Sequence, residues 1–323
     1  MRICCEQRQR ESGRRPAYCR FVVGHGGPGI AIGIMAHNEA ESIGHLLDGI
    51  LRQSAAPRIE RVLVMASACT DGTDEIVCRY ASHDPRIELH ADPERKGKVH
   101  AINRFIELVD QPLCIITSAD VSFHPTTVER ICAPFSDPAI GVVGARIIPV
   151  NRPNTFLGFT INLMWTLHHD LALVTPKLGE ICAFRNVIDG VNPAALYDEM
   201  SVLFEVEKRG YKAAYAADAL IENCGPGNIS DFIEQRTRWI VANLSVEREW
   251  SVRTTTLQPT MVARAAARYM REDWRHLHWF AGAALIELWA RMRARVEYAA
   301  STGRRFQVWR PIASTKLTAR SKR

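Results

Sequence analysis

Polar and charged residues gather at four short places in the first 120 residues, each beside an apolar run. The four clusters are His37-Asn38-Glu39, the segment 67–71, Lys96-Gly97-Lys98 and Ser118-Ala119-Asp120. A carboxylate such as that of Asp120 can hold a divalent cation whose shell is completed by substrate phosphate oxygens. Lys96 and Lys98 flank Gly97, which lets the backbone approach a phosphate closely. Asn38, Glu39 and Asp71 can hydrogen-bond a base or a ribose. Together the clusters predict a pocket for a nucleoside diphosphate.

Each cluster also has a simpler explanation when it is taken alone. Asp71-Gly72 is a favourable turn sequence, and Asn38 is a favourable residue for capping a helix. The agreement of all four clusters favours the binding pocket over four unrelated turns.

Alternating strand and helix signals explain how these clusters would be positioned. Apolar runs predict strands at 30–36, 61–65, 87–90 and 113–117, and the spacing of apolar residues predicts helices over 43–51, 73–82 and 97–109. This alternation predicts an α/β fold with a mixed, mostly parallel sheet flanked by helices. Ligands bind at the carboxyl ends of the strands in such sheets, which is where the clusters fall. The sequence contains neither a Gly-x-Gly-x-x-Gly dinucleotide fingerprint after the first strand nor a Walker A motif.

The composition is that of a globular protein, and the charge is unevenly distributed. The 323 residues carry a formal charge of +6, with 47% hydrophobic residues, which excludes disordered, collagen-like and coiled-coil chains. Nine cysteines are too few for a disulfide scaffold and favour reduced thiols in an intracellular compartment. Residues 1–20 carry +4 and residues 253–323 carry +11, so the middle of the chain carries −9. Basic ends on an acidic body suggest an anionic surface as partner, and solvated basic tails are the alternative.

The motifs and their order resemble family 2 glycosyltransferases of the GT-A fold. The first set comprises the segment from Ile34 to Glu39, the turn from Thr70 to Thr73, Lys96-Gly97-Lys98 running into Asn103, and Ala119-Asp120. In a second set, Asp198-Glu199 precedes Gly210-Tyr211. The segment from Gln235 to Trp239 has the Gln-x-x-Arg-Trp pattern of the cellulose-synthase and hyaluronan-synthase-like branch. The resemblance covers residues 30–245.

This resemblance implies an inverting transfer of a sugar from a nucleotide-sugar donor to an acceptor hydroxyl, on a glycan or a lipid-linked molecule. It implies Mg²⁺ or Mn²⁺ held by Asp120, with Glu199 at the position of the general base. The donor-binding residues would be His37, Asn38, Glu39, Asp71, Lys96, Lys98, Ser118 and Asp120; the catalytic group would be Asp198, Glu199, Gln235, Arg238 and Trp239. Three regions follow: a basic, Gly-rich tail (1–29), a GT-A catalytic domain (30–250) and a basic helical C-terminal extension (251–323). Within the domain, 30–150 would be the nucleotide-sugar half and 151–250 the acceptor half.

Two residues depart from the family pattern. Ser118 stands where the family has an acid two residues before the metal-binding aspartate, and Glu199 stands where the base is usually an aspartate. A neutral hydroxyl is a weaker metal ligand than a carboxylate, so a degenerate protein that binds a nucleotide sugar or a membrane partner without catalysis is the alternative. Since the other motif positions are intact, we expect an active enzyme.

Two apolar segments suggest contact with a membrane. The stretch within 155–186 is either an interfacial helix near the acceptor or a buried core helix, and its His168-His169 pair is not expected to bind a metal. The stretch from Trp279 to Trp289, flanked by arginines, suits an amphipathic helix on anionic lipid or a helix packed on the catalytic domain. No apolar run is long enough to span a bilayer. We therefore expect a cytoplasmic protein, peripheral on the inner face of the membrane, with no nucleic-acid partner.

Overall fold

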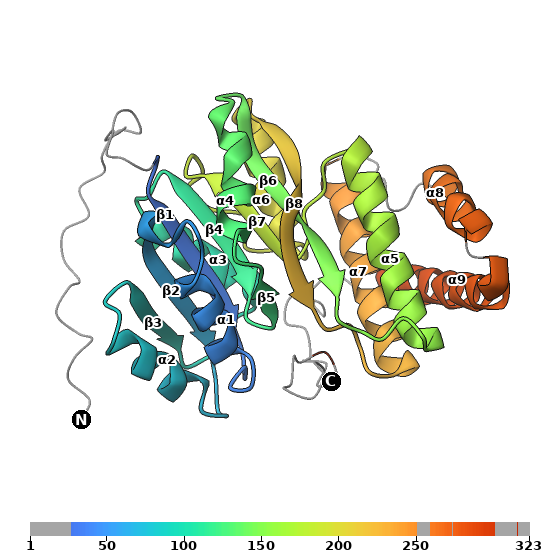
Figure 1. Cartoon of the computed structure of the whole chain (residues 1–323), viewed down its shortest axis with the longest axis horizontal. Coiled ribbons are helices and arrows are strands. Elements are labelled where there is room, and N and C mark those ends of the chain that lie inside the picture. Colours follow the sequence, from blue (N-terminus) through green and yellow to red (C-terminus); the bar gives the residue numbers. More distant parts are fainter. Residues whose placement is uncertain (1–26, 251–258, 273, 301–314, 316–323) are drawn as a thin grey trace.

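A computed structural model describes residues 27–250, 259–272, 274–300 and 315 (Figure 1). Within these residues, eight strands form one sheet in the order β3-β2-β1-β4-β7-β6-β8-β5. The strands are β1 (Ile30–Ala36), β2 (Ile59–Ser67), β3 (Ile87–Asp92), β4 (Leu113–Ser118), β5 (Val121–Phe123), β6 (Ile140–Pro149), β7 (Ile181–Arg185) and β8 (Lys212–Asn223). The block β3-β2-β1-β4 is parallel and β6 pairs parallel with β8, whereas β7 and β5 run antiparallel to their neighbours. The predicted mixed, mostly parallel sheet is confirmed.

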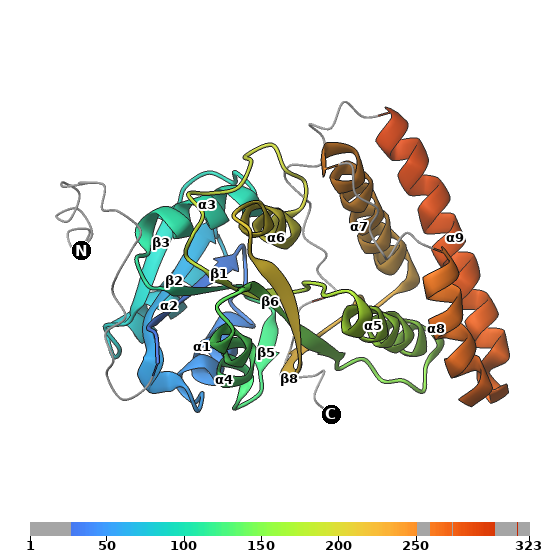
Figure 2. The ribbon, with the colours of Figure 1, turned by 90° about the horizontal axis from the view of Figure 1, so that it is seen from above.

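Helices cover both faces of the sheet. The helices are α1 (Ile43–Leu51), α2 (Thr73–Ala81), α3 (Lys98–Leu108), α4 (Thr127–Cys132), α5 (Phe156–Val174), α6 (Asp198–Lys208), α7 (Ile229–Trp250), α8 (Pro259–Glu272) and α9 (Leu277–Ala300), with short 3₁₀ turns at Ala56–Arg58, Ala133–Ser136 and Trp274–His276. Apolar residues of α1, α2, α4 and α5 pack on one face, and those of α3 and α6 pack on the other. Helices α5, α7, α8 and α9 gather beyond β6 and β8, on the side away from β3 (Figures 1 and 2).

Strand β1 shows why the middle of the sheet is buried on both faces. All seven residues of this strand are buried: Ile30, Ile32 and Ile34 join one core cluster, while Ala31 and Met35 join the other. Gly33 faces the ring of Phe105 on α3, and a Cβ at this position would lie 2.7 Å from that ring. The glycine thus allows α3, which begins at Lys98, to pack closely on the sheet.

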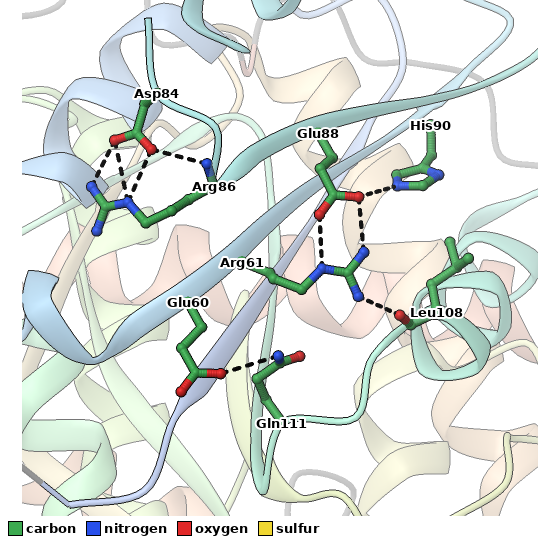
Figure 3. A network of polar contacts seen from close by, with 8 residues as sticks. All are labelled: Glu60, Arg61, Asp84, Arg86, Glu88, His90, Leu108 and Gln111. Carbon is green, nitrogen blue, oxygen red and sulfur yellow. Dashed lines mark hydrogen bonds and ion pairs between the residues drawn. The ribbon is translucent and has the colours of Figure 1, made fainter. Parts of the chain in front are cut away.

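A polar network ties β2 and β3 to the end of α3 (Figure 3). Arg61 donates two parallel hydrogen bonds to Glu88, from Nε to Oε1 at 2.7 Å and from Nη2 to Oε2 at 2.8 Å, and it also donates to the Leu108 carbonyl. These bonds from Arg61 lower the pKa of Glu88 although burial opposes its charge. The bidentate pair with Glu88 joins β2 to β3 and fixes the Arg61 guanidinium, which also holds the last residue of α3.

The elements predicted before residue 120 are confirmed. The predicted strand at 30–36 has those bounds, and the strands predicted at 61–65, 87–90 and 113–117 extend further, to Ser67, Asp92 and Ser118. The three predicted helices correspond to α1, α2 and α3.

The two apolar segments both form helices that pack on other elements. In α5, Ile161 and Trp165 enter the core, while Phe159 meets Trp279 and Phe280 of α9 edge-to-face. Most of α5 is thus a packed helix, as in the second alternative, although its last residues are exposed. Helix α9 lies along α7 (Figure 2) and buries Phe280. None of the helices in the described ranges combines the length and the apolar character that crossing a membrane requires.

Parts of the predicted tail and extension lie outside the described residues. These are residues 1–26 of the N-terminal tail and residues 251–258, 273, 301–314 and 316–323 of the C-terminal extension. The division of the chain into a tail, a catalytic domain and an extension stays a prediction.

Candidate active site

Side chains of the first two clusters bind the ends of β1 and β2 together. The Asn38 side-chain oxygen accepts from the Thr70 amide at 2.8 Å. Asp71 accepts from the Ala40 amide at 3.0 Å and from the Thr73 hydroxyl at 2.6 Å. Asn38 also adopts a left-handed backbone conformation, with φ of +56°, which asparagine tolerates better than most residues. The turn role considered for Asp71 is therefore present, since its side chain also accepts from the Thr73 amide. Asn38 does not cap α1, whose N-cap residue is Ser42, and instead joins the loops that follow β1 and β2.

His37 and Glu39 belong to the same edge of the sheet. His37 Nδ1 lies 2.5 Å from the Ser67 carbonyl oxygen, which links the ends of β1 and β2. Glu39 accepts from the Ser42 hydroxyl at 2.8 Å, just before α1 begins. These four residues of the predicted donor-binding set thus follow the carboxyl ends of the adjacent parallel strands β1 and β2.

Asp92, at the end of β3, organises the loop that carries the lysines. Its carboxylate lies 3.1 Å from Lys96 Nζ and 3.1 Å from His100 Nε2, and it also accepts from the Glu94 amide. These bonds, led by the one from the Glu94 amide, lower the pKa of Asp92. Lys96 is therefore paired with an acid of its own loop. Asp92 was not predicted as a site residue, although an acid at the end of a strand is the same signal that identified Asp120.

Lys98 brings together residues from three elements. Its Nζ lies 2.7 Å from Asp198, 2.6 Å from Glu199 and 3.2 Å from the Ser118 hydroxyl. Desolvation opposes its charge, but Asp198 and Glu199 outweigh that effect and raise the pKa of Lys98 well above its ordinary value. The lysine motif, the end of β4 and the acid pair at the start of α6 thus meet at one point.

The two acids respond differently to this environment. Burial raises the pKa of Asp198, but Lys98 outweighs it, so the pKa of Asp198 falls below its ordinary value. Burial and the neighbouring charge of Asp198 raise the pKa of Glu199 well above its ordinary value. A carboxylate whose pKa is raised is the better proton acceptor once ionised.

A cavity of about 270 Å³ opens beside Lys98 and the acid pair. Its polar lining includes Lys98, Glu180, Asp198, Glu199, Gln235 and Arg238, and its apolar wall includes Trp165, Tyr197 and Trp239. Gln235, Arg238 and Trp239 all come from α7. The three predicted residues of the Gln-x-x-Arg-Trp pattern therefore share the cavity with the predicted base.

Aromatic rings pack along the apolar wall. The Trp239 ring centroid lies 6.4 Å from those of Tyr197 and His168. His168 Nε2 lies 3.2 Å from the Leu178 carbonyl oxygen, and burial lowers the pKa of His168 to about 3. His168 is therefore neutral at physiological pH and packs against Trp239, which lines the cavity. Aromatic rings beside polar groups suit a sugar ring, which has apolar faces and hydroxyl edges.

Glu180 also lines the cavity, beside Ser118, but it was not predicted as a site residue. The Ser118 hydroxyl lies 3.5 Å from Glu180 Oε2, and the Ser118 amide donates to the Glu180 carbonyl at 3.4 Å. Burial, followed by the charge of Asp120, raises the pKa of Glu180 to about 7. Glu180 is therefore within electrostatic reach of Asp120.

The side-chain oxygen atoms near Asp120 fit a divalent cation that would arrive with a diphosphate. In the ranges described above, no group of three or more His, Cys, Asp or Glu side chains is arranged to hold a metal on its own. Asp120 offers a carboxylate. Val121, the residue after Asp120, lies opposite Asn223 where β5 pairs with β8. The Asn223 side-chain oxygen is buried and has no hydrogen-bond partner among the described residues. Mg²⁺-type sites ordinarily use one or two carboxylates and complete their shell with substrate phosphates.

The predicted residues thus fall into two neighbouring groups. His37, Asn38, Glu39 and Asp71 shape the ends of β1 and β2, whereas Lys98, Ser118, Asp198, Glu199, Gln235, Arg238 and Trp239 lie in or beside the cavity. Asp120 lies two residues after Ser118 in the sequence. Lys96 lies on the loop between β3 and α3, where it pairs with Asp92.

The sequence is similar to those of known proteins. The family model "Glycosyl transferase family 2" matches residues 31–201. Glycosyltransferase AglE of Haloferax volcanii is 27% identical over 120 residues, which cover 37% of this chain and 40% of AglE. An N-acetylglucosaminyltransferase of Rhizobium sp. (strain N33) is 22% identical over 241 residues, covering 66% of this chain and 52% of that protein. The chain spans about half the length of these curated relatives or less.

A solved structure shares the fold. The mannosyltransferase PcManGT from Pyrobaculum calidifontis, in complex with GDP-Man and Mn²⁺, superposes with a TM-score of 0.61 at 21% identity. The match covers 85% of this chain and 88% of PcManGT. The family model spans more than half of the chain, from the first strand to the start of α6. The chain therefore belongs to glycosyl transferase family 2.

Proposed function

We propose that this chain is a glycosyltransferase that moves a sugar from a nucleotide-sugar donor to an acceptor hydroxyl, with inversion at the sugar carbon. One observation carries the proposal: Lys98 binds Asp198 and Glu199 at 2.6–2.7 Å beside a cavity that Arg238 and Trp239 also line. Phosphate-binding, proton-accepting and sugar-stacking groups from distant parts of the chain therefore meet at one place.

The donor would lie along the carboxyl ends of β1, β2 and β4. Asn38 and Asp71 shape the loops for the nucleoside, and Lys98 and Arg238 place positive charge toward the diphosphate. Asp120 would hold Mg²⁺ or Mn²⁺, with Ser118 beside it. When bound, such a cation supplies Lewis-acid stabilisation of the charge on the departing nucleoside diphosphate.

Glu199 would act as the general base. Its carboxylate takes the proton of the acceptor hydroxyl as the oxygen forms a bond to the sugar carbon, and the bond from that carbon to the diphosphate oxygen breaks with its electron pair. The raised pKa of Glu199 makes it a better proton acceptor than Asp198. A single displacement of this kind inverts the sugar carbon.

The acceptor would lie against the aromatic wall. Gln235, Arg238 and Trp239 line the cavity together, which supports assignment to the cellulose-synthase and hyaluronan-synthase-like branch. The relative named N-acetylglucosaminyltransferase supports N-acetylglucosamine as a candidate for the transferred sugar.

The exposed face of α9 supports a peripheral position on an anionic membrane. Large apolar residues repeat along one side of this helix and stay exposed: Leu285 (67%), Leu288, Trp289, Met292 and Val296 (69%). Three arginines nearby are exposed: Arg271 at the end of α8, Arg275 in the short turn before α9, and Arg295 on α9 itself. An apolar stripe beside basic residues is the pattern that binds anionic lipid surfaces.

Turnover of sugar nucleotides tests the enzymatic proposal. The purified chain with Mn²⁺ is incubated with a panel of UDP- and GDP-sugars and candidate acceptors, and released nucleoside diphosphate is measured. Glu199→Gln should lower transfer by roughly 10²–10⁴-fold, the usual contribution of a general base. The matched control is Glu205→Gln, which removes an acid of the same helix that pairs with Lys208, and it should keep full activity. Calorimetric donor binding without turnover by the wild type would instead indicate a binding protein.

Co-sedimentation tests the membrane proposal. The wild type should bind vesicles that contain phosphatidylglycerol and stay unbound with phosphatidylcholine alone. Trp289→Ser should weaken binding, whereas Ile229→Ser, at an exposed position on α7, should not. Equal binding of the two variants would contradict the assignment of the α9 face.

A further inference from the structure

We propose that Glu180 supplies the second carboxylate of the divalent-metal site, beside Asp120, at the place where Ser118 offers only a hydroxyl. This inference rests on the proposed function, because it concerns the cation that would accompany the donor diphosphate. It assigns a role to the residue that directly precedes β7, 60 positions after Asp120 in the sequence.

Strand pairing places Glu180 opposite Ser118. Strands β4 and β7 are antiparallel, with Thr117 opposite Ile181, so the next pair beyond the ladder is Ser118 and Glu180. The backbone bond between them is present, and the side chains also meet, with 3.5 Å between the Ser118 hydroxyl and Glu180 Oε2. The Glu180 carboxylate thus lies directly beside the Ser118 side chain, next to the position where the family pattern has an acid.

A cation would be stabilised by the acidic groups around Glu180. Asp120 and Asp198 both act on Glu180 as like charges. Lys98 is the cation that acts on it, but Lys98 Nζ already lies within 2.7 Å of both Asp198 and Glu199. Among the ion pairs of the described residues, none joins Glu180 to a basic group within 4 Å. Since two partly buried carboxylates repel each other, a divalent ion between Glu180 and Asp120 would be favoured electrostatically.

The loop before Glu180 is held firmly in position. A Cβ on Gly179 would lie 2.4 Å from the Ile147 side chain, and a Cβ on Gly144 would lie 2.1 Å from the Lys177 carbonyl oxygen. The segment 177–180 therefore packs directly on β6 through two glycine positions. A carboxylate on so closely packed a segment has little freedom to lose when it binds a cation.

A role for Glu180 as a second proton acceptor makes a different prediction. A base would affect the rate of transfer without changing the affinity for the metal. A metal ligand would affect metal affinity even when no acceptor is present. Metal binding, measured without turnover, therefore separates the two roles.

Titration of Mn²⁺ followed by electron paramagnetic resonance tests the inference. Free hexaaqua Mn²⁺ gives a strong signal that is lost on binding, so dissociation constants are obtained for the full chain with UDP or with GDP present. Glu180→Gln should weaken Mn²⁺ binding by about 10–100-fold, the range typical for groups that support a metal site. Glu205→Gln should leave the dissociation constant unchanged.

A rescue variant guards against a merely structural effect. In the Glu180→Gln background, Ser118→Asp places a carboxylate beside position 180 from the opposite strand, two residues before Asp120, and should recover most of the lost affinity. Failure of rescue together with a lowered melting temperature of Glu180→Gln would overturn the metal role in favour of a structural one. Unchanged Mn²⁺ affinity in Glu180→Gln, with binding lost in Asp120→Asn, would overturn this inference and leave the proposed function standing. A wild type that binds no Mn²⁺ with either nucleotide would contradict both.

Discussion

The ion pair between Arg236 and Glu287 joins α7, which carries the Gln-x-x-Arg-Trp residues, to α9. Arg236 donates from Nε at 2.6 Å and from Nη2 at 2.9 Å to the two oxygens of Glu287. Arg236 is only 8% exposed, and its guanidinium lies 5.1 Å from the Trp239 ring centroid. We predict that Glu287→Gln leaves the buried charge of Arg236 without its counter-ion and destabilises the protein.

The size of the effect follows from the pKa of Glu287. Burial opposes ionisation, but Arg236 and Arg291 lower this pKa from 4.5 to about 2. The difference between the ordinary pKa and this lowered pKa corresponds to about 3 kcal/mol. This value lies at the lower end of the cost of about 3–5 kcal/mol that removal of one partner from a buried pair typically has. We therefore expect Glu287→Gln to lower the free energy of unfolding by about 3 kcal/mol at pH 7.

Urea unfolding of the wild type and the variant measures this difference. The matched control is Glu297→Gln, which breaks the more exposed pair with Arg293 on the same helix and should cost less than about 1 kcal/mol.

Because the pKa of Glu287 is lower in the folded than in the unfolded protein, its stabilisation is complete above pH 4.5 and is lost as the pH falls toward 2. The difference between wild type and Glu287→Gln should shrink over that range. A cost equal to that of Glu297→Gln, or one that does not change with pH, would refute the reasoning.

Three further predictions concern the core and the site. Gly33→Ala places a methyl group 2.7 Å from the Phe105 ring and should lower stability by about 1–3 kcal/mol; an unchanged melting temperature would mean that the ring moves aside freely. Lys98→Met removes the cation between Asp198 and Glu199, so the acid limb of the pH profile of kcat/KM should move to higher pH, and an unmoved limb would contradict the pairing. Trp239→Ala should raise KM for the acceptor while calorimetric donor binding stays unchanged, and a loss confined to donor affinity would place this ring on the donor side instead.

Strong local signals explain why the first half of the fold could be predicted. The strand Ile30–Ala36 is a continuous apolar run because it is buried on both faces, and α1 shows its apolar stripe at helical spacing. Strand β8 lacks such a signal, since its sequence KAAYAADALIEN contains five alanines. This segment forms a strand because β6 and β5 pair with it on either side. Neighbouring strands supply that stabilisation, and a local pattern does not reveal it.

Motifs identified most of the residues at the site, but their partners depend on the packing. Lys96 and Lys98 were both assigned to the donor from one short motif. In the structure, Lys96 pairs with Asp92 of its own loop, whereas Lys98 reaches α6, 100 residues further along the chain. Glu180 was missed because its place beside Ser118 follows from the register of β7 against β4. Register of this kind is set by contacts far apart in sequence, so a search for short motifs does not detect it.

The balance of charge at the site gives a physical reason for a cation. Glu180, Asp198 and Glu199 line the cavity, and Asp120 lies within electrostatic reach of Glu180, whereas Lys98 and Arg238 are the lysine and arginine in the described lining. A nucleoside diphosphate entering such a site adds negative charge to a region where acids already outnumber bases. Desolvation would make this repulsion stronger than in water. A divalent ion held by these acids would offset their repulsion of the diphosphate. Ser118 in place of an acid lowers the negative charge of the site. If Glu180 contributes a carboxylate, the ion still has two carboxylate ligands.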